Sequence, residues 1–437
     1  MTPTIDPADL PTTPIPAKWR PIARLSGVRV RPDPSEATET AATAKTPTIW
    51  RDVMLVVLLF VAWRGALFTV DYFGRMITTP ITRPGGGAST GFWPGHPFWD
   101  GYLRWDSLHF LRIVKDGYTV ETAGPFKGMS TDAAFLPFYP FAVKALGHLR
   151  VPGFGKVFTS VWPPGLILSN LCLIGAMYYI LRIARMYLDE DGARRSVVYL
   201  LAFPTSFFLS SFYSEAMFLL TTSASFYHFL KGNHARCGVW GFLAATTRSP
   251  GIVLLPAFVI GHLWERRGKI DRSDLSMLWV GLVPCGLMTV MAYYAWKLGD
   301  PFAFSKAHSA WGRNYVWPHQ TIIDTFNRIN WSLPIDFFAG NILLLDLITA
   351  FAFLTLPFLL LKGYHKSLSI YAMLMILMPL STGITMSLQR VVLVIFPAYL
   401  ALAKFGKNRE IDRLIVFGFA LGLGVYKLAF SNGHPIL

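Results

Sequence analysis

Charge and cysteine are both scarce in this sequence. Only 15% of its 437 residues are charged, whereas 53% are hydrophobic and 15% are aromatic, and the mean hydropathy is +0.42. Soluble domains carry about 25% charged residues, so this composition excludes an ordinary soluble domain and indicates a polytopic membrane protein. The three cysteines, Cys172, Cys237 and Cys285, lie in or beside apolar runs and form no C-x-x-C pair. They are typical of packing residues rather than of a disulfide framework or a metal site.

The short motifs of zinc proteases and P-loop nucleotide-binding proteins are absent as well. The chain contains no H-E-x-x-H, no G-x-x-x-x-G-K-[ST] and no Cys/His metal spacing. Basic residues outnumber acidic ones by 40 to 25, for a net charge of +15. Because they lie mostly in short connections between apolar runs, they fit the positive-inside rule rather than a nucleic-acid-binding surface. We therefore expect no metal, no cofactor and no nucleic-acid partner.

Long apolar runs begin at about residue 52 and recur through the rest of the chain. The first, at about 52–71, has the length that a bilayer core requires. A shorter stretch follows at 133–149, and further candidate membrane segments lie near 163–187, 195–212, 214–230, 238–263, 275–297, 341–361, 368–381, 390–405 and 412–430. The pattern predicts an all-α fold, a polytopic transmembrane helical bundle with about 10–11 membrane segments.

The remaining stretches define a tail and two long loops. Residues 1–48 are rich in Pro, Thr and Ala, which predicts a disordered cytosolic tail before one membrane domain at 49–437. No spanning candidate lies at about 72–131 or at about 298–340. Because the short loops gather the basic residues, these two long loops are expected on the extracytosolic side.

The run at 238–263 is interrupted by T-T-R-S-P-G at 246–251. The charge bias requires this run to begin and end on the cytosolic side, so the break predicts a re-entrant turn, which is permitted only where protein or a cavity surrounds the backbone. That turn places Arg248 at membrane depth, and Arg390 begins another apolar run. A cation at such depth is costly unless it is paired, so a functional site and a structural ion pair both stay open for the two arginines.

Polar chemistry concentrates in the first long loop, in F-W-D-G-Y-L-R-W-D-S-L-H-F-L-R. Residues 107–116 can form a short interfacial helix with Leu108, Leu111 and Val114 on one face. Asp106 is then either the N-cap of this helix or a catalytic base. A carboxylate at the lip of the membrane can take the proton from an acceptor hydroxyl, while arginines stabilise the phosphate that departs from a lipid-linked donor.

Five motifs in order resemble the PIG-V family. They are R-W-D-S-L-H-F-L-R-I-V-K-D-G-Y, A-F-L-P-F-Y-P, F-P-T-S-F-F-L-S-S-F-Y-S-E-A-M-F, A-A-T-T-R-S-P-G and S-L-Q-R-V-V-L-V-I-F-P. This family comprises relatives of GPI mannosyltransferase II, bacterial members included, within the GT-C superfamily of membrane glycosyltransferases. The resemblance covers nearly everything from about residue 50 onward and leaves the tail outside.

The resemblance implies a GT-C-type fold and an inverting transfer of a sugar, most often mannose, from a polyprenyl- or dolichyl-phosphate donor. It points to the first extracytosolic loop as the catalytic loop and to Asp106 as the general base. Asp100 is the second candidate for the base, or an ordinary loop carboxylate. The acceptor hydroxyl belongs to a glycolipid, a glycan or a protein, and a partner subunit stays undetermined. Few cysteines and no retention signal favour a bacterial plasma membrane, or the endoplasmic reticulum membrane in a eukaryote.

Seven further residues are candidates for binding the two substrates. The donor phosphate is assigned to Arg248, Arg390, Gln389 and His109, and the acceptor to Glu215, Trp311 and Arg313. His109 can instead cap its loop, and Glu215 suits a capping box with Ser211 or Ser214. Trp311 and Arg313 also suit anchoring at the membrane interface.

A transporter or flippase of lipid-linked sugars is the alternative function. It predicts ionisable residues paired near the membrane midplane and a repeated architecture. The sequence shows no convincing repeat, and its densest polar cluster lies in an outer loop. A catalytically silent partner subunit is a weaker alternative, against which the presence of Asp106 argues.

Overall fold

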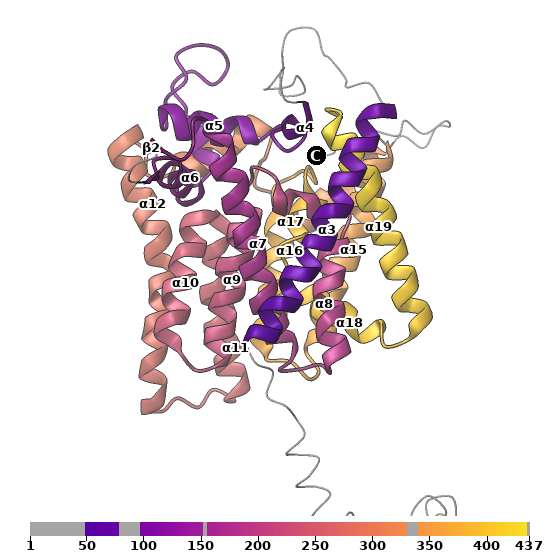
Figure 1. The fold of residues 1–437 in the computed structure, drawn as a ribbon. Coiled ribbons are helices and arrows are strands. Elements are labelled where there is room, and N and C mark those ends of the chain that lie inside the picture. The colour runs from indigo at the N-terminus through magenta and orange to yellow at the C-terminus, as the bar shows by residue number, and fades with distance from the viewer. Residues whose placement is uncertain (1–48, 78–96, 152–154, 330–339, 435–437) are drawn as a thin grey trace, which may run out of the picture. The chain divides into compact units, whose positions relative to one another are not determined.

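The computed structural model describes residues 49–77, 97–151, 155–329 and 340–434 (Figure 1). The chain divides into two compact units, Met1–Met54 and Leu55–Leu437, and the second holds every contact discussed below. In the first unit only the start of helix α3 (Ile49–Ile77) is described. The tail predicted at 1–48 lies outside the described residues, and so do a glycine-rich stretch at 84–91 and an Asn-x-Ser triplet at 330–332.

The described part of the chain is helical apart from one two-stranded antiparallel hairpin, in which Arg150 of β1 (Arg150–Val151) pairs with Lys156 of β2 (Gly155–Lys156). The predicted all-α class is therefore confirmed. After α3 the helices are α4 (Pro97–Asp100), α5 (Ser107–Asp116), η3 (Thr131–Ala134), α6 (Phe138–Gly147), α7 (Trp162–Ala184), α8 (Glu190–Ala202), η4 (Ser206–Ser210), α9 (Glu215–Leu230), α10 (His234–Thr247), η5 (Ser249–Val253), α11 (Leu254–Glu265), η6 (Arg272–Gly281), α12 (Leu282–Leu298), α13 (Ala303–Ala307), η7 (His308–Trp311), α14 (Pro318–Arg328), α15 (Gly340–Leu360), α16 (Lys366–Leu380), α17 (Leu388–Val392), α18 (Pro397–Phe405) and α19 (Arg409–Ser431).

Five helices among the described residues are long and apolar enough to cross a membrane, which identifies an integral membrane protein. These spans are Ile49–Gly74, Trp162–Ala184, Asp274–Leu298, Ile342–Leu360 and Arg409–Ser431. The larger number of segments predicted from the sequence includes shorter runs, which fold as α8 to α11, α16 and α18 and have at most 16 residues each. Membrane crossing by these shorter helices stays a prediction.

The predicted interruption of the run at 238–263 is present, between α10 and α11. Arg248 is extended, with φ −148° and ψ 142°, and the tight helix η5 follows it. Proline at position 250 cannot continue the hydrogen-bond ladder of α10, and a Cβ on Gly251 would lie 2.6 Å from backbone atoms of Ala244. The break therefore needs this proline and glycine, and it turns the Arg248 side chain away from the helix axis that precedes it.

Helix α5 lies at one end of the bundle in Figure 1, where it contacts α6 and η3. Its buried face is formed by Phe110, Ile113 and Val114. Of the predicted apolar face, Val114 is therefore buried, whereas Leu108 lines a cavity. The start of α5 is fixed to the segment before α9 by two hydrogen bonds. The Ser107 hydroxyl donates to the carbonyl of Phe212 at 3.2 Å, and the backbone N–H of Phe212 donates to the carbonyl of Tyr102 at 3.1 Å.

Candidate active site

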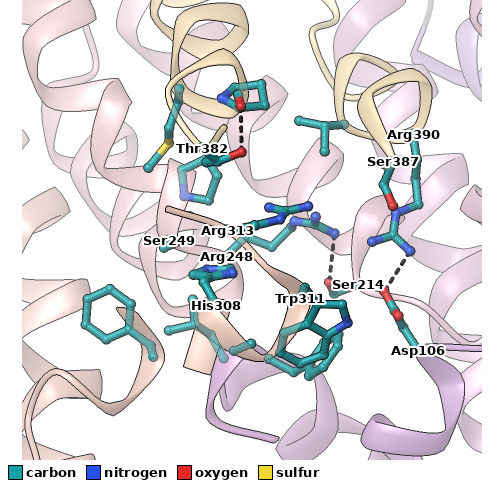
Figure 2. Close-up of a pocket in the computed structure, with 18 of the residues that line it drawn as sticks. Asp106, Ser214, Arg248, Ser249, His308, Trp311, Arg313, Thr382, Ser387 and Arg390 are labelled. Carbon is teal, nitrogen blue, oxygen red and sulfur yellow. Dashed lines mark hydrogen bonds and ion pairs between the residues drawn. The ribbon is translucent and has the colours of Figure 1, made fainter. Parts of the chain in front are cut away.

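A cavity of about 660 Å³ opens between α5, α9, the α10–α11 break, α13, η7, α16 and α17. Its volume is within the range of ligand-binding pockets, about 300–1,000 Å³. Figure 2 shows Arg248, Arg313 and Arg390 reaching into this space, with Asp106, His308 and Trp311 at its wall. Distant parts of the sequence thus form one site, because Asp106 and Arg390, which are 284 residues apart in the chain, are in contact there.

Asp106 pairs with Arg390 inside this cavity. Nη1 of Arg390 donates to Oδ2 of Asp106 at 2.7 Å, and the side chains are 9% and 15% exposed respectively. Asp106 occupies the predicted N-cap position of α5 but does not cap the helix, because its backbone is helical and its side chain makes no capping hydrogen bond. Burial alone would raise the pKa of Asp106, but the charge of Arg390, followed by that of His109, holds this pKa below its ordinary value.

Glu215 links two arginines at the floor of the site. Its Oε1 accepts from Nη1 of Arg248 at 2.6 Å and lies 3.3 Å from Nε of Arg390, and the side chain is 1% exposed. The capping-box interpretation of Glu215 is wrong, because Ser214 is the N-cap of α9 and makes no side-chain capping bond. A carboxylate this deeply buried is stable only when it is paired, so Glu215 holds Arg248 and Arg390 in place.

The backbone beside the Asp106–Arg390 pair is strained on both sides. Only three non-glycine residues of the described chain have positive φ, and two of them are Trp105 at 54° and Ser387 at 65°. Trp105 directly precedes Asp106, and Ser387 precedes α17, which carries Arg390. Left-handed backbone costs a non-glycine residue on the order of 1–3 kcal/mol and gathers at functional sites. Strained backbone at Trp105 and Ser387 thus accompanies the positions from which Asp106 and Arg390 contact each other.

Arg313 and His308 come from the second long loop. Nη2 of Arg313 donates to the carbonyl of Met386 at 3.3 Å, and among the described residues no carboxylate pairs with it. Burial, with Arg390 as the largest repulsive charge, lowers the pKa of Arg313 to about 10. Burial and then the charge of Arg313 lower the pKa of His308 to about 4, so this ring is neutral at pH 7. The cavity therefore holds more guanidinium charge than its carboxylates balance.

His109 lines the cavity within a cluster of aromatic rings. Its ring stacks on Phe135 with a centroid distance of 4.8 Å, and the Trp311 ring lies 5.6 Å away. Nδ1 of His109 lies 2.6 Å from Oδ1 of Asp132 in η3. This contact joins the start of α5 to η3, which agrees with the predicted loop-capping role and also leaves the ring lining the cavity.

Two of the predicted site residues do not line the cavity. Asp100 is buried in an ion pair with Arg104 at 2.8 Å. Gln389 donates from Nε2 to Asp346 at 3.0 Å, and its Oε1 accepts from the Tyr426 hydroxyl at 2.8 Å. The structure therefore gives Asp100 and Gln389 structural contacts and places the other seven candidates in the cavity wall.

Asp132 and His308 also belong to the site and were not among the sequence candidates. Asp132 was detectable only as a carboxylate just before the motif A-F-L-P-F-Y-P, and His308 only as a histidine in an aromatic loop. No group of three or more metal-ligating side chains occurs in the part of the chain that the structure describes.

Comparison with known proteins shows that this chain is similar to one family of enzymes. Residues 54–266 match the family model of the mannosyltransferases called PIG-V. The predicted resemblance to PIG-V is confirmed. The matched segment contains Asp106, His109, Asp132, Glu215 and Arg248, whereas Arg313 and Arg390 lie beyond it.

Two relatives, from mouse and rat, are both described as GPI alpha-1,6-mannosyltransferase 2. The mouse protein is 29% identical over 214 residues, which are 46% of this chain and 39% of the relative. The rat protein is 28% identical over 162 residues, 35% of this chain and 30% of the relative. The chain thus matches well under half the length of these PIG-V relatives.

Two solved structures show a weak likeness to this chain. ArnT from Cupriavidus metallidurans bound to undecaprenyl phosphate has a TM-score of 0.44 and 13% identity, over 87% of this chain and 77% of that one. The Archaeoglobus fulgidus oligosaccharyltransferase in complex with zinc and sulfate has a TM-score of 0.43 and 12% identity, over 84% of this chain and 53% of that one.

Proposed function

We propose that the protein is a membrane glycosyltransferase that moves a sugar, mannose in the first instance, from a polyprenyl- or dolichyl-phosphate donor to an acceptor hydroxyl. The observation that carries this proposal is the convergence of Asp106 with Arg248, Arg313 and Arg390 in one cavity. Proton removal from the acceptor and charge stabilisation on a departing phosphate are the two tasks of such a transfer. The PIG-V match supports the sugar and the reaction class.

The charges in the cavity suit a phosphodiester. Glu215 and Asp106 balance Arg248 and Arg390, so Arg313 supplies one positive charge in excess. A sugar joined to a lipid through one phosphate carries one negative charge. We therefore assign Arg313, with Arg248 and Arg390, to the donor phosphate, in place of the acceptor role that the sequence suggested. Arginine suits this task because its planar guanidinium donates two parallel hydrogen bonds to phosphate.

In the transfer step Asp106 takes the proton of the acceptor hydroxyl as its oxygen attacks the anomeric carbon. The bond from that carbon to the phosphate oxygen breaks, its electron pair stays on the phosphate, and the configuration inverts. Asp106 is a weak base while Arg390 is its partner. A phosphate that engages Arg390 draws this positive charge away, so donor binding makes Asp106 more basic when the acceptor arrives.

The lipid tail of the donor fits the apolar side of the same cavity. Met375 and Met378 of α16 and Val391 of α17 line that side, together with Val394. A tail that leaves between these helices keeps the phosphate at the arginines and the sugar toward Asp106. Both long loops contribute to the cavity, so we place the reaction on the extracytosolic side, opposite the short basic loops.

The transporter alternative predicts ionisable pairs near the middle of the spanning helices. The buried pair of Lys427 and Asp71, at 2.9 Å, lies instead near the C-terminal ends of α19 and α3. Nζ of Lys427 also donates to the carbonyl of Gly101 at 3.2 Å, five residues before Asp106. This pair therefore supports the first long loop, as a catalytic loop requires, and we favour the transferase.

The test is sugar transfer from a synthetic polyprenyl-phosphate mannose by the purified protein in nanodiscs. Asp106→Asn is expected to lower kcat by about 10²- to 10⁴-fold, the range typical of losing a general base. Asp116→Asn is the matched control, since Asp116 is exposed at the other end of α5 and does not line the cavity. Wild-type transfer is expected to survive EDTA.

Asp100→Asn, included in the same series, separates the two candidate bases. Equal rates for wild type and Asp106→Asn would remove Asp106 from the mechanism, and a selective loss in Asp100→Asn would transfer its role there. Protein-dependent movement of labelled lipid across the bilayer, without sugar transfer by any variant, would establish the transporter instead.

A further inference from the structure

The contact between His109 and Asp132 has the geometry of a proton-accepting pair. Oδ1 of Asp132 lies 2.6 Å from Nδ1 of His109, and the Asp132 side chain is only 2% exposed. A carboxylate at this distance keeps the proton of a neutral ring on Nδ1, which leaves the lone pair on Nε2. No hydrogen bond to Nε2 is present among the described residues, and the ring lines the cavity.

The surroundings of His109 hold its ring in one orientation. Phe135 stacks on it at an interplanar angle of 19°, and Trp311 approaches from η7. Asp132 is held in turn within its own segment, where the next residue, Ala133, accepts a hydrogen bond from Tyr294 at 3.1 Å. A ring packed in this way needs little reorganisation when it accepts a proton.

His109 and Asp106 lie on one side of the start of α5. They are three residues apart, and side chains at that spacing on a helix are neighbours. The backbone at Asp106 is helical, and the N–H of Phe110 donates to its carbonyl, so helical spacing applies here. Both side chains line the same cavity.

We infer that His109, oriented by Asp132, takes over the proton that Asp106 removes from the acceptor. This inference rests on the proposed function. Each turnover leaves one proton on Asp106, which must lose it before the next acceptor binds. The Nε2 lone pair of His109 receives this proton, Asp106 returns to the carboxylate, and the imidazolium is stabilised by Asp132. The imidazolium then releases the proton to water at the mouth of the cavity.

The direction of this proton transfer follows from the neighbours of each group. Arg390 stabilises the ionised form of Asp106, and Asp132 stabilises the protonated form of His109, so both contacts favour movement from carboxyl to imidazole. Arg112 approaches Asp132 from the same helix, at 3.6 Å. The other charged or titratable groups that face the cavity are Glu215 of α9, Arg248 after α10, His308 of η7, Arg313, Arg390 of α17, and the two tyrosines Tyr213 and Tyr315.

The same experiment distinguishes two other roles of the His109–Asp132 pair. If the contact only joins α5 to η3, its loss lowers the stability of the fold. If Nε2 binds the donor phosphate, loss of His109 lowers donor affinity. If His109 carries the proton, its loss lowers kcat and changes the pH dependence of kcat, because a ring that is already protonated at acid pH cannot accept a further proton.

The experiment measures kcat from pH 5 to pH 8.5 at saturating donor and acceptor, for the full chain in nanodiscs. The variants are His109→Gln and Asp132→Asn, with His148→Gln as the matched control, because His148 is exposed and its Nδ1 contacts only a backbone carbonyl of its own helix. Binding of polyprenyl phosphate and the melting temperature are recorded for every variant, so that losses of affinity or folding are seen directly.

For wild type we expect kcat to fall at acid pH. We expect His109→Gln to lower kcat by about 100-fold and to abolish this fall. Asp132→Asn, which keeps the ring, lowers kcat by about 10-fold and moves that fall to lower pH, because an amide no longer favours the imidazolium. Donor affinity and the His148→Gln profile stay unchanged. These results would distinguish a proton carrier from a structural contact.

A wild-type pH profile that His109→Gln leaves unaltered would overturn the inference, and so would a loss confined to donor affinity or to the melting temperature. A different result would refute the proposed function itself. If wild type transfers no sugar at any pH, the transferase itself is refuted, whereas wild-type transfer with an unaltered His109→Gln profile refutes only the proton carrier.

Discussion

Replacing Arg313 by glutamine tests the charge balance on which donor binding depends. The cavity contains three guanidinium groups and two carboxylates, so the substitution changes its formal charge from +1 to 0. At 4 Å and an effective dielectric constant of about 20, one unit charge stabilises a phosphate by about 4 kcal/mol before desolvation is subtracted. A hydrogen bond to a charged group contributes a net 1.5–3 kcal/mol or so. A loss of about 1.5–3 kcal/mol predicts that Arg313→Gln binds polyprenyl phosphate with a Kd about 10- to 100-fold higher than wild type.

The assay is equilibrium binding of polyprenyl phosphate to the purified protein in nanodiscs of zwitterionic lipid. Arg313→Lys keeps the charge without the planar fork and is expected to lose less affinity than Arg313→Gln. Arg328→Gln is the matched control, because Arg328 is exposed at the end of α14 and does not line the cavity. Unchanged lipid-phosphate affinity in Arg313→Gln, together with a higher KM for the acceptor, would refute this reasoning and restore the acceptor assignment.

Three further predictions concern the groups around the site. Glu215→Gln leaves Arg248 and the buried Arg390 without their shared carboxylate and should destabilise the fold by about 3 kcal/mol. Chemical unfolding in detergent measures this, with the exposed Glu410→Gln as the control. Lys427→Met leaves Asp71 buried without its ammonium partner and should lower the free energy of unfolding by a similar amount. The double variant Lys427→Met, Asp71→Leu should regain at least part of this stability, because it removes both charges. The folded chain keeps His308 neutral with a pKa of about 4, whereas the unfolded chain binds a proton below about 6.5, so stability falls as the pH falls through this window. Melting temperatures at pH 7 and pH 5 check this, because His308→Gln should lose less stability over that interval than wild type, and equal losses would contradict it.

The sequence by itself determined the class of the protein and the segments that carry its chemistry. Apolar runs of bilayer length are a local property, so the all-α membrane fold could be read from composition and spacing. The break at 246–251 was also readable, because proline ends a helix whatever surrounds it. Arg248 stood out because a charge at membrane depth is costly and has to be explained. Asp106 stood out because it lies in the polar cluster of the first long loop.

The tertiary structure alone decided which of these residues meet. Asp106, Glu215 and Arg390 lie on three segments far apart in the chain, and no local pattern specifies that one guanidinium contacts both carboxylates. The same packing assigned Gln389 to Asp346, away from the cavity, although Gln389 is next to Arg390 in the sequence. Helix geometry separates adjacent side chains by about 100°, so neighbours in sequence face different surroundings once the helices pack.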